Sequence, residues 1–198
     1  MTVLVTGFEP FEGHAVNASW LAVQELVRTW RGPAIEAVRL PVSFRRAPGL
    51  LEEAVARTRP RAVVSVGEAG DADAVLVERV ALNVADARIP DEDGDRPVDE
   101  PLVPGGPAAW FTALPLRACV DAAERAGVPA RVSSSAGTYV CNAVFYRLAT
   151  VLAGSDVPHG FVHVPRTPEQ VAGTGRTGMA PGDAARGLAA VLEATLAR

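Results

Sequence analysis

One cysteine stands where protein chains often place a nucleophile. Cys141 follows a run of small and turn-forming residues, and residues 143–152 after it have the apolar spacing of a helix. This pattern predicts a strand-to-helix turn with Cys141 at or near the helix N-terminus, where free backbone N–H groups and the positive end of the helix dipole meet. A thiol at such a place ionises more readily than a free one, as a nucleophile requires. The alternative is a small buried hydrophobic side chain, which is a common role of cysteine.

A thiol nucleophile needs a general base, and histidine is the usual one. The chain has three histidines. His163 lies near the carboxyl end of a strand predicted over His159–Val164, and ligands of open α/β sheets gather at that edge of the sheet. His14 lies in the first loop, and His159 is expected at a strand entrance, facing solvent. His163 is therefore the best placed, although a buried histidine that bonds to the backbone is an equal alternative.

The third group of such a site is an acid that orients the base. Glu78 is a candidate because it interrupts the apolar run Val75–Asn83, and a buried carboxylate is rarely left unpaired. Strand alternation, however, places every second side chain on the outer face. From periodicity alone a solvent-facing Glu78, or one paired with Arg79 or Arg88, is favoured.

The elements that must position these residues indicate an α/β fold. Strands are predicted at Thr2–Thr6, Ala34–Leu40, Arg61–Val66, Val75–Asn83, Ala130–Ser135 and His159–Val164, and helices at Ala18–Trp30, Phe44–Thr58, Thr112–Ala126, residues 143–152 and Asp183–Ala197. The early β-α-β-α-β order predicts helices on both faces of a largely parallel sheet. The fourth strand follows the third too closely for a helical crossover, so it is expected to be antiparallel and the sheet mixed. Long loops are expected at residues 86–106 and 166–182.

Composition narrows the class of protein. The chain has 198 residues, of which 48% are hydrophobic, and this predicts one globular domain with a sizeable core. A formal net charge of −4 provides no basic footprint for nucleic acid, and the longest apolar runs are too short to span a membrane. The N-terminus begins as a strand without the basic start of a signal peptide, so a cytoplasmic protein is expected.

Several chemistries are excluded by residue type. All 19 basic residues are arginine, which removes Schiff-base catalysis, serine–lysine catalysis and the lysine of a P-loop. Cys119 and Cys141 form neither a disulfide framework nor a zinc-binding spacing. The run Gly173–Gly178 matches the dinucleotide fingerprint in letters, but it does not directly follow a strand, so a loop is favoured.

Six segments together resemble the pyroglutamyl peptidase I family, also called pyrrolidone-carboxylate peptidases, which are cytoplasmic cysteine peptidases that remove an N-terminal pyroglutamate. They are Val3–Phe11 with Asn17 and Trp20, Val66–Gly70, Glu78–Asp91 with Gly94, Gly105–Ala109, Ser135–Asn142 with Phe145 and Tyr146, and Gly160–Pro165. The resemblance implies a three-layer α/β/α sandwich with a central mixed, mostly parallel sheet, and one peptidase domain over residues 1–198. It also implies a catalytic triad of Cys141, His163 and Glu78. The choice of Glu78 as the orienting acid comes from the resemblance alone.

The resemblance implies the rest of the site as well. Arg88 is similar in position to a family arginine that supports the oxyanion. Apolar walls around the substrate ring would come from Phe8, Phe11, Ile89, Tyr139 and Val140. Peptides and proteins with an N-terminal pyroglutamate would be cleaved through a thioester acyl-enzyme, without a cofactor or a metal, and family members commonly assemble into dimers or tetramers.

The chain departs from the family pattern near the expected pocket. Glu12 replaces the first glycine of a pair that is usually Gly-Gly, and Glu68 replaces a residue with an amide side chain. Asp71-Ala72 replaces a usual Gly-Arg, and Leu76 replaces a serine or threonine. These departures leave substrate specificity and pocket polarity open. One alternative is a family member that binds a related lactam or a peptide N-terminus without turnover. Another, by analogy of fold alone, is a small-molecule transferase or phosphorylase, against which the absence of a phosphate-binding motif argues.

Overall fold

The computed structural model describes residues 2–197, and a six-stranded sheet forms its centre. The strands are β1 (Val3–Phe8), β2 (Ile35–Leu40), β3 (Ala62–Ala69), β4 (Val75–Glu78), β7 (Ala130–Ser133) and β8 (His159–Pro165). They lie in the order β2-β1-β3-β8-β4-β7, and neighbours run parallel except for β8 and β4, which are antiparallel. The predicted mixed, mostly parallel sheet is confirmed.

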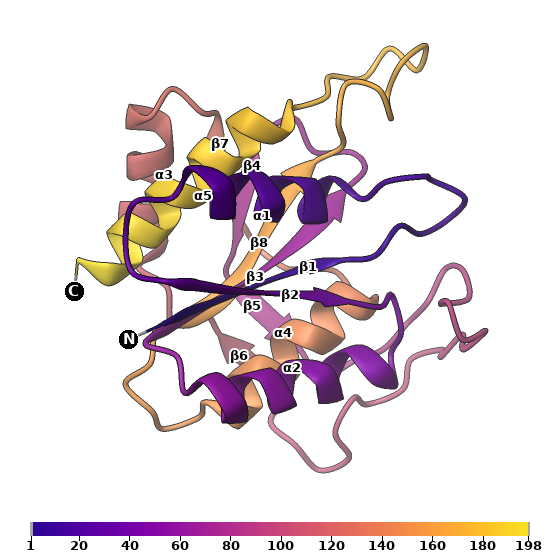
Figure 1. Cartoon of the computed structure of the whole chain (residues 1–198). Helices are drawn as coiled ribbons and strands as arrows, with labels where there is room; N and C mark the ends of the chain where they lie inside the picture. The colour runs from indigo at the N-terminus through magenta and orange to yellow at the C-terminus, as the bar shows by residue number, and fades with distance from the viewer. Residues whose placement is uncertain (1, 198) are drawn as a thin grey trace.

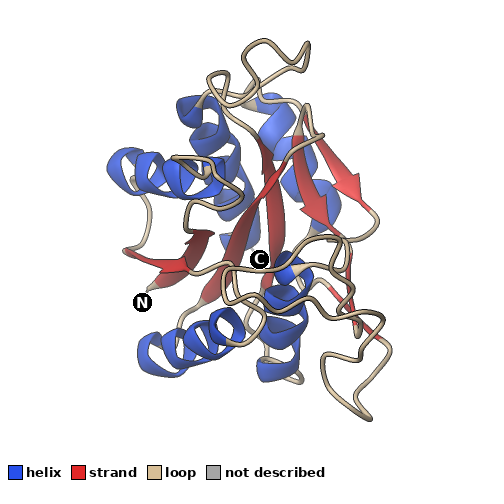
Figure 2. Ribbon diagram, turned by 90° about the vertical axis from the view of Figure 1, so that its right-hand side faces the viewer, coloured by secondary structure: helices blue, strands red, loops and turns tan. Residues whose placement is uncertain are grey.

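Five helices cover the two faces of this sheet in the described part of the chain. They are α1 (Ala18–Thr29), α2 (Arg46–Thr58), α3 (Leu116–Arg125), α4 (Val140–Val151) and α5 (Pro181–Leu196). Helices α1, α3 and α5 pack on one face, and α2 and α4 pack on the other (Figure 1). The turned view shows the sheet between the two helix layers (Figure 2). The three-layer sandwich is thereby confirmed, with one hydrophobic core on each side of the sheet.

The helix boundaries follow from local chemistry. The Asn17 side chain accepts a hydrogen bond from the Ser19 N–H at 3.0 Å, so Asn17 caps α1 as predicted. Helix α2 begins at Arg46, two residues before Pro48, because a proline in the first turn gives up only an N–H that has no partner within the helix. Helix α3 begins after Pro115, four residues later than predicted.

The predicted strand over Val75–Asn83 is wrong as one element. It breaks at Arg79 into β4 and a short strand β5 (Val80–Leu82), which pairs antiparallel with β6 (Ala109–Phe111) outside the main sheet. The apolar run conceals this break because both pieces are partly or fully buried. Strand β6 was not predicted, since only its pairing with β5 makes it a strand.

Two other expectations need correction. Strand β3 continues past Val66 to Ala69, because its pairing with β8 extends through Gly67 and Glu68. His159 is buried rather than solvent-facing, and its ring contacts the Val157 carbonyl at 2.8 Å through Nδ1. Burial lowers the pKa of His159, with the backbone contact opposing this effect.

The long segment between β5 and β6 is an ordered loop. Asp91 holds it together: Oδ1 accepts the N–H groups of Asp93 and Asp95, and Oδ2 accepts the N–H of Phe44, which precedes α2. Asn83 adds a reciprocal pair of bonds with the backbone of Val103. Because side chains satisfy so many of its backbone groups, the loop presents a defined surface beside α4.

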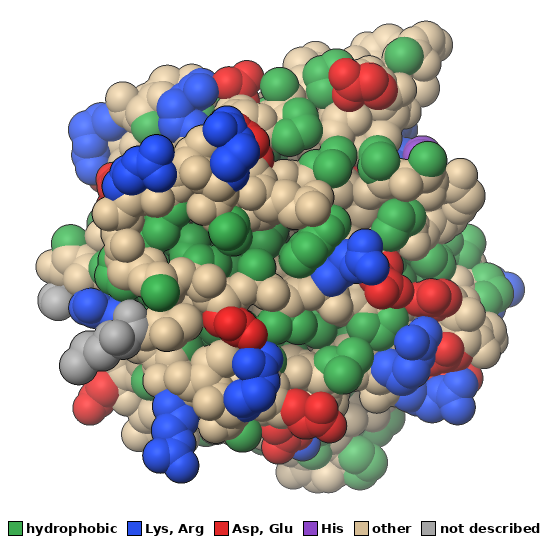
Figure 3. Space-filling model, in the orientation of Figure 1, with side chains coloured by type: hydrophobic (Ala, Val, Ile, Leu, Met, Phe, Trp, Pro, Cys, Tyr) green, Lys and Arg blue, Asp and Glu red, His purple; other side chains and the backbone are tan. Residues whose placement is uncertain are grey.

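The exterior carries both signs of charge. Arginine and acidic side chains are interspersed on the face that carries α1 and α2 (Figure 3). Within residues 2–197, none of the helices has the length and apolar character needed to cross a membrane.

Asn142 provides a test of how α4 is attached to β5 and the chain just after it. Its fully buried amide accepts the N–H of Leu82 and donates to the carbonyls of Leu82 and Val84, each at 2.9 Å. Asn142→Ala leaves these backbone groups without partners, so the free energy of unfolding should fall by about 2–4 kcal/mol in urea titrations. The exposed amide of Gln24 on α1 is the control, and Gln24→Ala should change stability by less than about 0.5 kcal/mol. Equal effects of the two substitutions would contradict this account.

Candidate active site

Cys141 is the second residue of α4, as its predicted place at a helix N-terminus requires. The chain leaves β7 at Ser133 and turns through Gly137, whose φ of +79° is a conformation that favours glycine. The thiol is partly exposed, whereas the chain's other cysteine, Cys119, is buried. Cys141 therefore has the access and the helix-end environment of a reactive thiol, and the alternative of a fully buried small hydrophobe does not apply.

His163 and Glu78 form a buried pair. The Nδ1–H of His163 donates to Oε1 of Glu78 at 2.8 Å, and the Glu78 side chain is 1% exposed. The pair spans the antiparallel strands β8 and β4, where His163 lies opposite Leu76 and Glu78 is the next residue on the same face. Glu78 thus points inward, and the solvent-facing orientation favoured by periodicity alone is wrong.

Gly67 lets the cysteine and the histidine meet. A Cβ built on Gly67 would stand 2.9 Å from Cys141 Sγ and 2.9 Å from His163 Cδ2. Thiol and imidazole therefore converge on the space above a bare Cα of β3. Because Nδ1 of His163 is turned to Glu78, the opposite edge of the ring, which carries Nε2, faces Cys141. This is the arrangement of a nucleophile, a base and a carboxylate that orients the base.

Electrostatics favour a charged imidazolium in this arrangement. Burial by itself lowers the pKa of His163, but the hydrogen bond and negative charge of Cys141, followed by those of Glu78, outweigh it and raise this pKa to about 10. The second oxygen of Glu78, Oε2, has no hydrogen-bond partner within residues 2–197. The carboxylate therefore directs its single strong contact at His163.

A pocket of about 310 Å³ opens beside the thiol. Its lining includes Cys141 together with all the residues that the resemblance implied, namely Phe8, Phe11, Arg88, Ile89, Tyr139 and Val140. The ring of Tyr139 packs against Phe11 and Phe44, with centroids 5.9 and 5.3 Å apart, and its hydroxyl donates to the Pro90 carbonyl. Burial, followed by the charges of Asp91 and Cys141, raises the pKa of Tyr139, so this wall residue stays neutral.

Charged residues also line the pocket. Arg88 lies mostly in solvent and faces Glu12, with the two charged groups 3.9 Å apart. Glu12 also approaches Arg166 at 3.6 Å, and Arg166 bonds to Glu68. The structure places Arg88 at the same pocket as Cys141, with its ion-pair contact directed to Glu12.

Some of these residues were not predicted from the sequence. Arg166, Asp86, Val42 and the side chain of Asn17 line the pocket as well. Arg166 has a recognisable signal, because it directly follows the carboxyl end of β8, at the edge where ligands of such sheets gather. Val42 lies two residues beyond the carboxyl end of β2 and carries a similar signal, whereas the position of Asp86 in a long loop does not by itself indicate a site.

Comparison with known proteins identifies close relatives. The family described as pyroglutamyl peptidase has a sequence model that matches residues 1–197. The pyrrolidone-carboxylate peptidase of Clavibacter michiganensis is 50% identical over 99% of this chain and 93% of that protein, and the one from Streptomyces coelicolor is 47% identical over 97% and 90%. Among solved structures, pyroglutamyl peptidase I of Bacillus amyloliquefaciens has a TM-score of 0.95 at 38% identity, over 100% of this chain and 97% of that one. Pyrrolidone carboxyl peptidase of Thermococcus litoralis has a TM-score of 0.92 at 34% identity, over 99% and 93%.

The space over Gly67 can be tested without a substrate. Gly67→Ala adds a Cβ that forces the thiol and the imidazole apart, so alkylation of Cys141 by iodoacetamide at pH 7 should slow by about tenfold. Mass spectrometry of the modified chain gives the rate. Gly49→Ala is the matched control, because a Cβ there meets open space and Gly49 lies in α2, where alanine is the better helix former. A folded Gly67→Ala protein that is alkylated at the wild-type rate would refute the close approach.

The buried pair predicts a titration near pH 10. Since the folded-state pKa of His163 lies above its ordinary 6.5, the imidazolium persists through neutral pH and loses its proton only as the pH rises toward 10. Glu78→Gln removes one cause of this shift, so the His163 titration should move to lower pH. Imidazole ¹⁵N chemical shifts measured from pH 6 to 11 report both titrations. Identical midpoints in the two proteins would show that Glu78 does not stabilise the imidazolium.

Proposed function

The chain belongs to the family of pyroglutamyl peptidases, cysteine hydrolases that remove an N-terminal pyroglutamate, and we propose that it performs this reaction with Cys141, His163 and Glu78 as its triad. The observation that carries the assignment is the convergence of Cys141 and His163 over Gly67, with Glu78 bonded to the far side of the imidazole. A thiol, a base and an orienting acid in this order are the parts that acyl transfer requires.

Acylation begins from the thiolate–imidazolium pair. The Cys141 sulfur attacks the carbonyl carbon of the pyroglutamyl–peptide bond and forms a tetrahedral intermediate. As this intermediate collapses, the C–N bond breaks and His163 donates its proton to the leaving amine, which leaves a thioester on Cys141. The raised pKa of His163 ensures that the proton is present at neutral pH. Glu78 holds the ring in the tautomer and orientation that this transfer needs.

The oxyanion of the intermediate needs hydrogen-bond donors. The Cys141 backbone N–H is one of the first N–H groups of α4 and points out of the helix end, where the dipole also favours negative charge. We assign Arg88 as the second donor, because it lines the same pocket as Cys141 from the loop between β5 and β6. Donors of this kind each contribute a factor of about 10²–10³ to the rate.

Deacylation uses the same residues in reverse. After the amine leaves, His163 is neutral and takes a proton from a water molecule, whose oxygen attacks the thioester carbon. Collapse of the second tetrahedral intermediate breaks the C–S bond, releases pyroglutamic acid, which loses its proton to solvent, and restores the thiolate–imidazolium pair. His163 gives one proton to the leaving amine during acylation and takes one from water during deacylation. The proposed reaction therefore uses only residues of this chain and water.

The pocket suits a small neutral lactam. Phe8, Phe11 and Ile89 supply apolar wall, while the aromatic pair Phe11–Tyr139 offers flat surface to the ring. Glu68 stands in place of an amide, and it accepts hydrogen bonds from Arg166 and from the backbone at the start of α1. These partners compensate its negative charge, so a neutral substrate ring does not face an unpaired carboxylate. Binding without turnover is not favoured, because the relatives are named as peptidases.

The wider setting is part of the same proposal. Residues 1–198 form one peptidase domain that acts on peptides and proteins with an N-terminal pyroglutamate, and it does so in the cytoplasm. The proposed chemistry needs a reduced thiol at the partly exposed Cys141, which supports a reducing compartment. A homo-oligomer of two or four chains is proposed from the family resemblance alone.

Turnover of a fluorogenic pyroglutamyl amide tests the function. The wild-type protein should cleave it under reducing conditions, and Cys141→Ser should lower kcat/KM by at least about 10³-fold because an alcohol is a far weaker nucleophile than a thiolate. A prolyl amide, which lacks the lactam carbonyl, should be cleaved poorly. Cys119→Ser is the matched control and should retain activity, since Cys119 lies on α3 away from the pocket. No turnover by the wild type would overturn the function, and full activity of Cys141→Ser would overturn the mechanism.

A further inference from the structure

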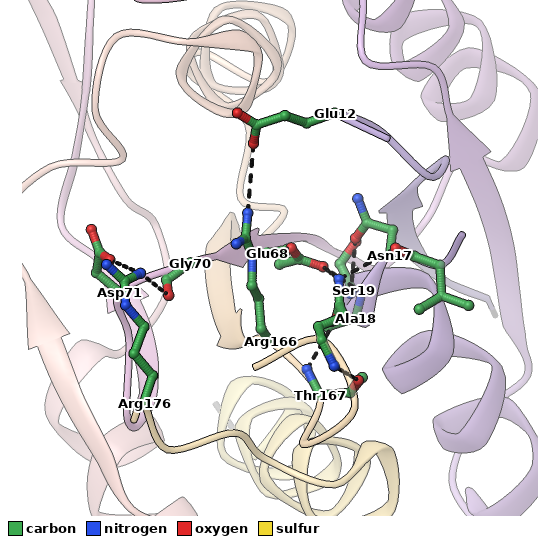
Figure 4. A network of polar contacts seen from close by, with 12 residues as sticks. Glu12, Asn17, Ala18, Ser19, Glu68, Gly70, Asp71, Arg166, Thr167 and Arg176 are labelled. Carbon is green, nitrogen blue, oxygen red and sulfur yellow. Dashed lines mark hydrogen bonds and ion pairs between the residues drawn. The ribbon is translucent and has the colours of Figure 1, made fainter. Parts of the chain in front are cut away.

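Both carboxylate oxygens of Glu68 accept hydrogen bonds, from three different donors. Its Oε1 accepts from Arg166 Nε at 2.9 Å, and its Oε2 accepts from the Ala18 N–H at 2.7 Å and from Gln170 Nε2 at 2.9 Å. The side chain is 12% exposed. Glu68 therefore joins the end of β3 to the start of α1 and to the loop that follows β8 (Figure 4).

Arg166 is the partner that faces the pocket. Its guanidinium lies against the backbone of Gly70, where a Cβ would stand 3.2 Å from Cζ. Nε is bonded to Glu68, and Nη2 approaches Glu12 at 3.6 Å across the pocket rim (Figure 4). Arg166 lines the pocket, and a guanidinium has five N–H donors, so these two contacts leave donors that a ligand of the pocket can use.

The loop after β8 is held at a second point. Arg176 pairs with Asp71 and donates to the Gly70 carbonyl at 3.0 Å. The acidic residues Glu68 and Asp71, both noted as departures from the family pattern, are thus each paired with an arginine of this loop. The Arg176–Asp71 pair is exposed, so the direction of the Arg166 side chain depends mainly on its bond to the less exposed Glu68.

We propose that Glu68 is a positioning residue of the substrate pocket, which holds the Arg166 guanidinium in the pocket wall where it donates to a carbonyl oxygen of the bound pyroglutamyl peptide. The inference rests on the proposed function, because it concerns how that substrate is held. Arg166 then contributes to substrate affinity, and Glu68 acts through it.

The chemistry of the three partners requires a carboxylate at this position. An amide in place of Glu68 has only one acceptor oxygen, and its NH₂ group would face either Arg166 Nε–H or the donors Ala18 N–H and Gln170 Nε2. Keeping the bond to the start of α1 places the NH₂ against Arg166, which must then turn away. Glu68→Gln, although nearly identical in shape, should therefore release Arg166.

The experiment is a double-mutant cycle of Glu68→Gln and Arg166→Met, with KM and kcat measured on the fluorogenic pyroglutamyl amide. Glu68→Gln should raise KM about tenfold while kcat changes less than about twofold, as expected for loss of a partly buried charge-assisted bond that positions substrate. Arg166→Met should raise KM to the same extent. In the Arg166→Met background, Glu68→Gln should have no further effect on KM.

Glu52→Gln is the matched control. It removes the negative charge from another arginine–glutamate pair, in which Arg147 Nε donates to Glu52 at 2.9 Å, on α2 and α4 away from the pocket. KM should not change in this variant. If Glu68→Gln fails to fold, Arg166→Lys replaces it, because it keeps both charges but lacks the Nε–H and should raise KM similarly.

The outcomes separate this inference from the function. The four proteins of the cycle are also prepared with Cys141→Ala and titrated calorimetrically with the same amide, which reads affinity without turnover. A tenfold loss of affinity that depends on Arg166 supports the inference whether or not the wild type is active. Unchanged affinity in Glu68→Gln, a loss that persists undiminished in the Arg166→Met background, or a fall in kcat at constant KM would each overturn it.

Discussion

The buried hydrogen bond between His163 and Glu78 depends on the one antiparallel pairing within the described central sheet. Strand β4 runs against β8, and the register sets Leu76 opposite His163, so Glu78 lies diagonally across from the imidazole on the same face. A shift of one residue would turn Glu78 to the other face of the sheet. Because both side chains are almost fully buried, the carboxylate retains its effect on the imidazolium, and the charge of each group compensates the cost of burying the other.

The rest of the site is assembled around this pair by close backbone approach. Strand β3 runs beside β8 and presents Gly67 next to His163, while α4 begins above them with Cys141 in its first turn. Asn142 anchors that turn by bonding to the backbone around β5. The start of α4, Gly67 and the His163–Glu78 pair therefore lie together near the carboxyl ends of β3 and β8, where α/β sheets commonly bind ligands.

The charged pocket residues are consistent with a neutral substrate ring because they compensate one another. Glu68 is bonded by Arg166 and a helix N-terminus, and Glu12 lies between Arg166 and Arg88. The inner contacts, between Glu68 and Arg166, are hydrogen-bonded and partly buried, whereas the outer contacts of Glu12 are longer and more exposed. The walls at the ring remain apolar, so recognition is divided between aromatic surface and a few directed donors.

The sequence by itself determined the features that depend on interactions between residues close together in the chain. The Asn17 cap, the turn before Cys141, the helix after it, and the β-α-β-α-β order all follow from local propensities and spacing. The resemblance added the choice of Glu78 as the acid, together with Arg88 and five wall residues of the pocket. Tertiary structure alone decided which long-range pairs form. Glu78 and His163 are 85 residues apart, and Glu68 and Arg166 are 98 apart. The alternation of side chains along one strand does not reveal which face of the sheet is buried. It also does not show that the Val75–Asn83 run is divided between two sheets. Those outcomes depend on which strands become neighbours, because hydrogen-bond partners and burial are properties of the packed sheet.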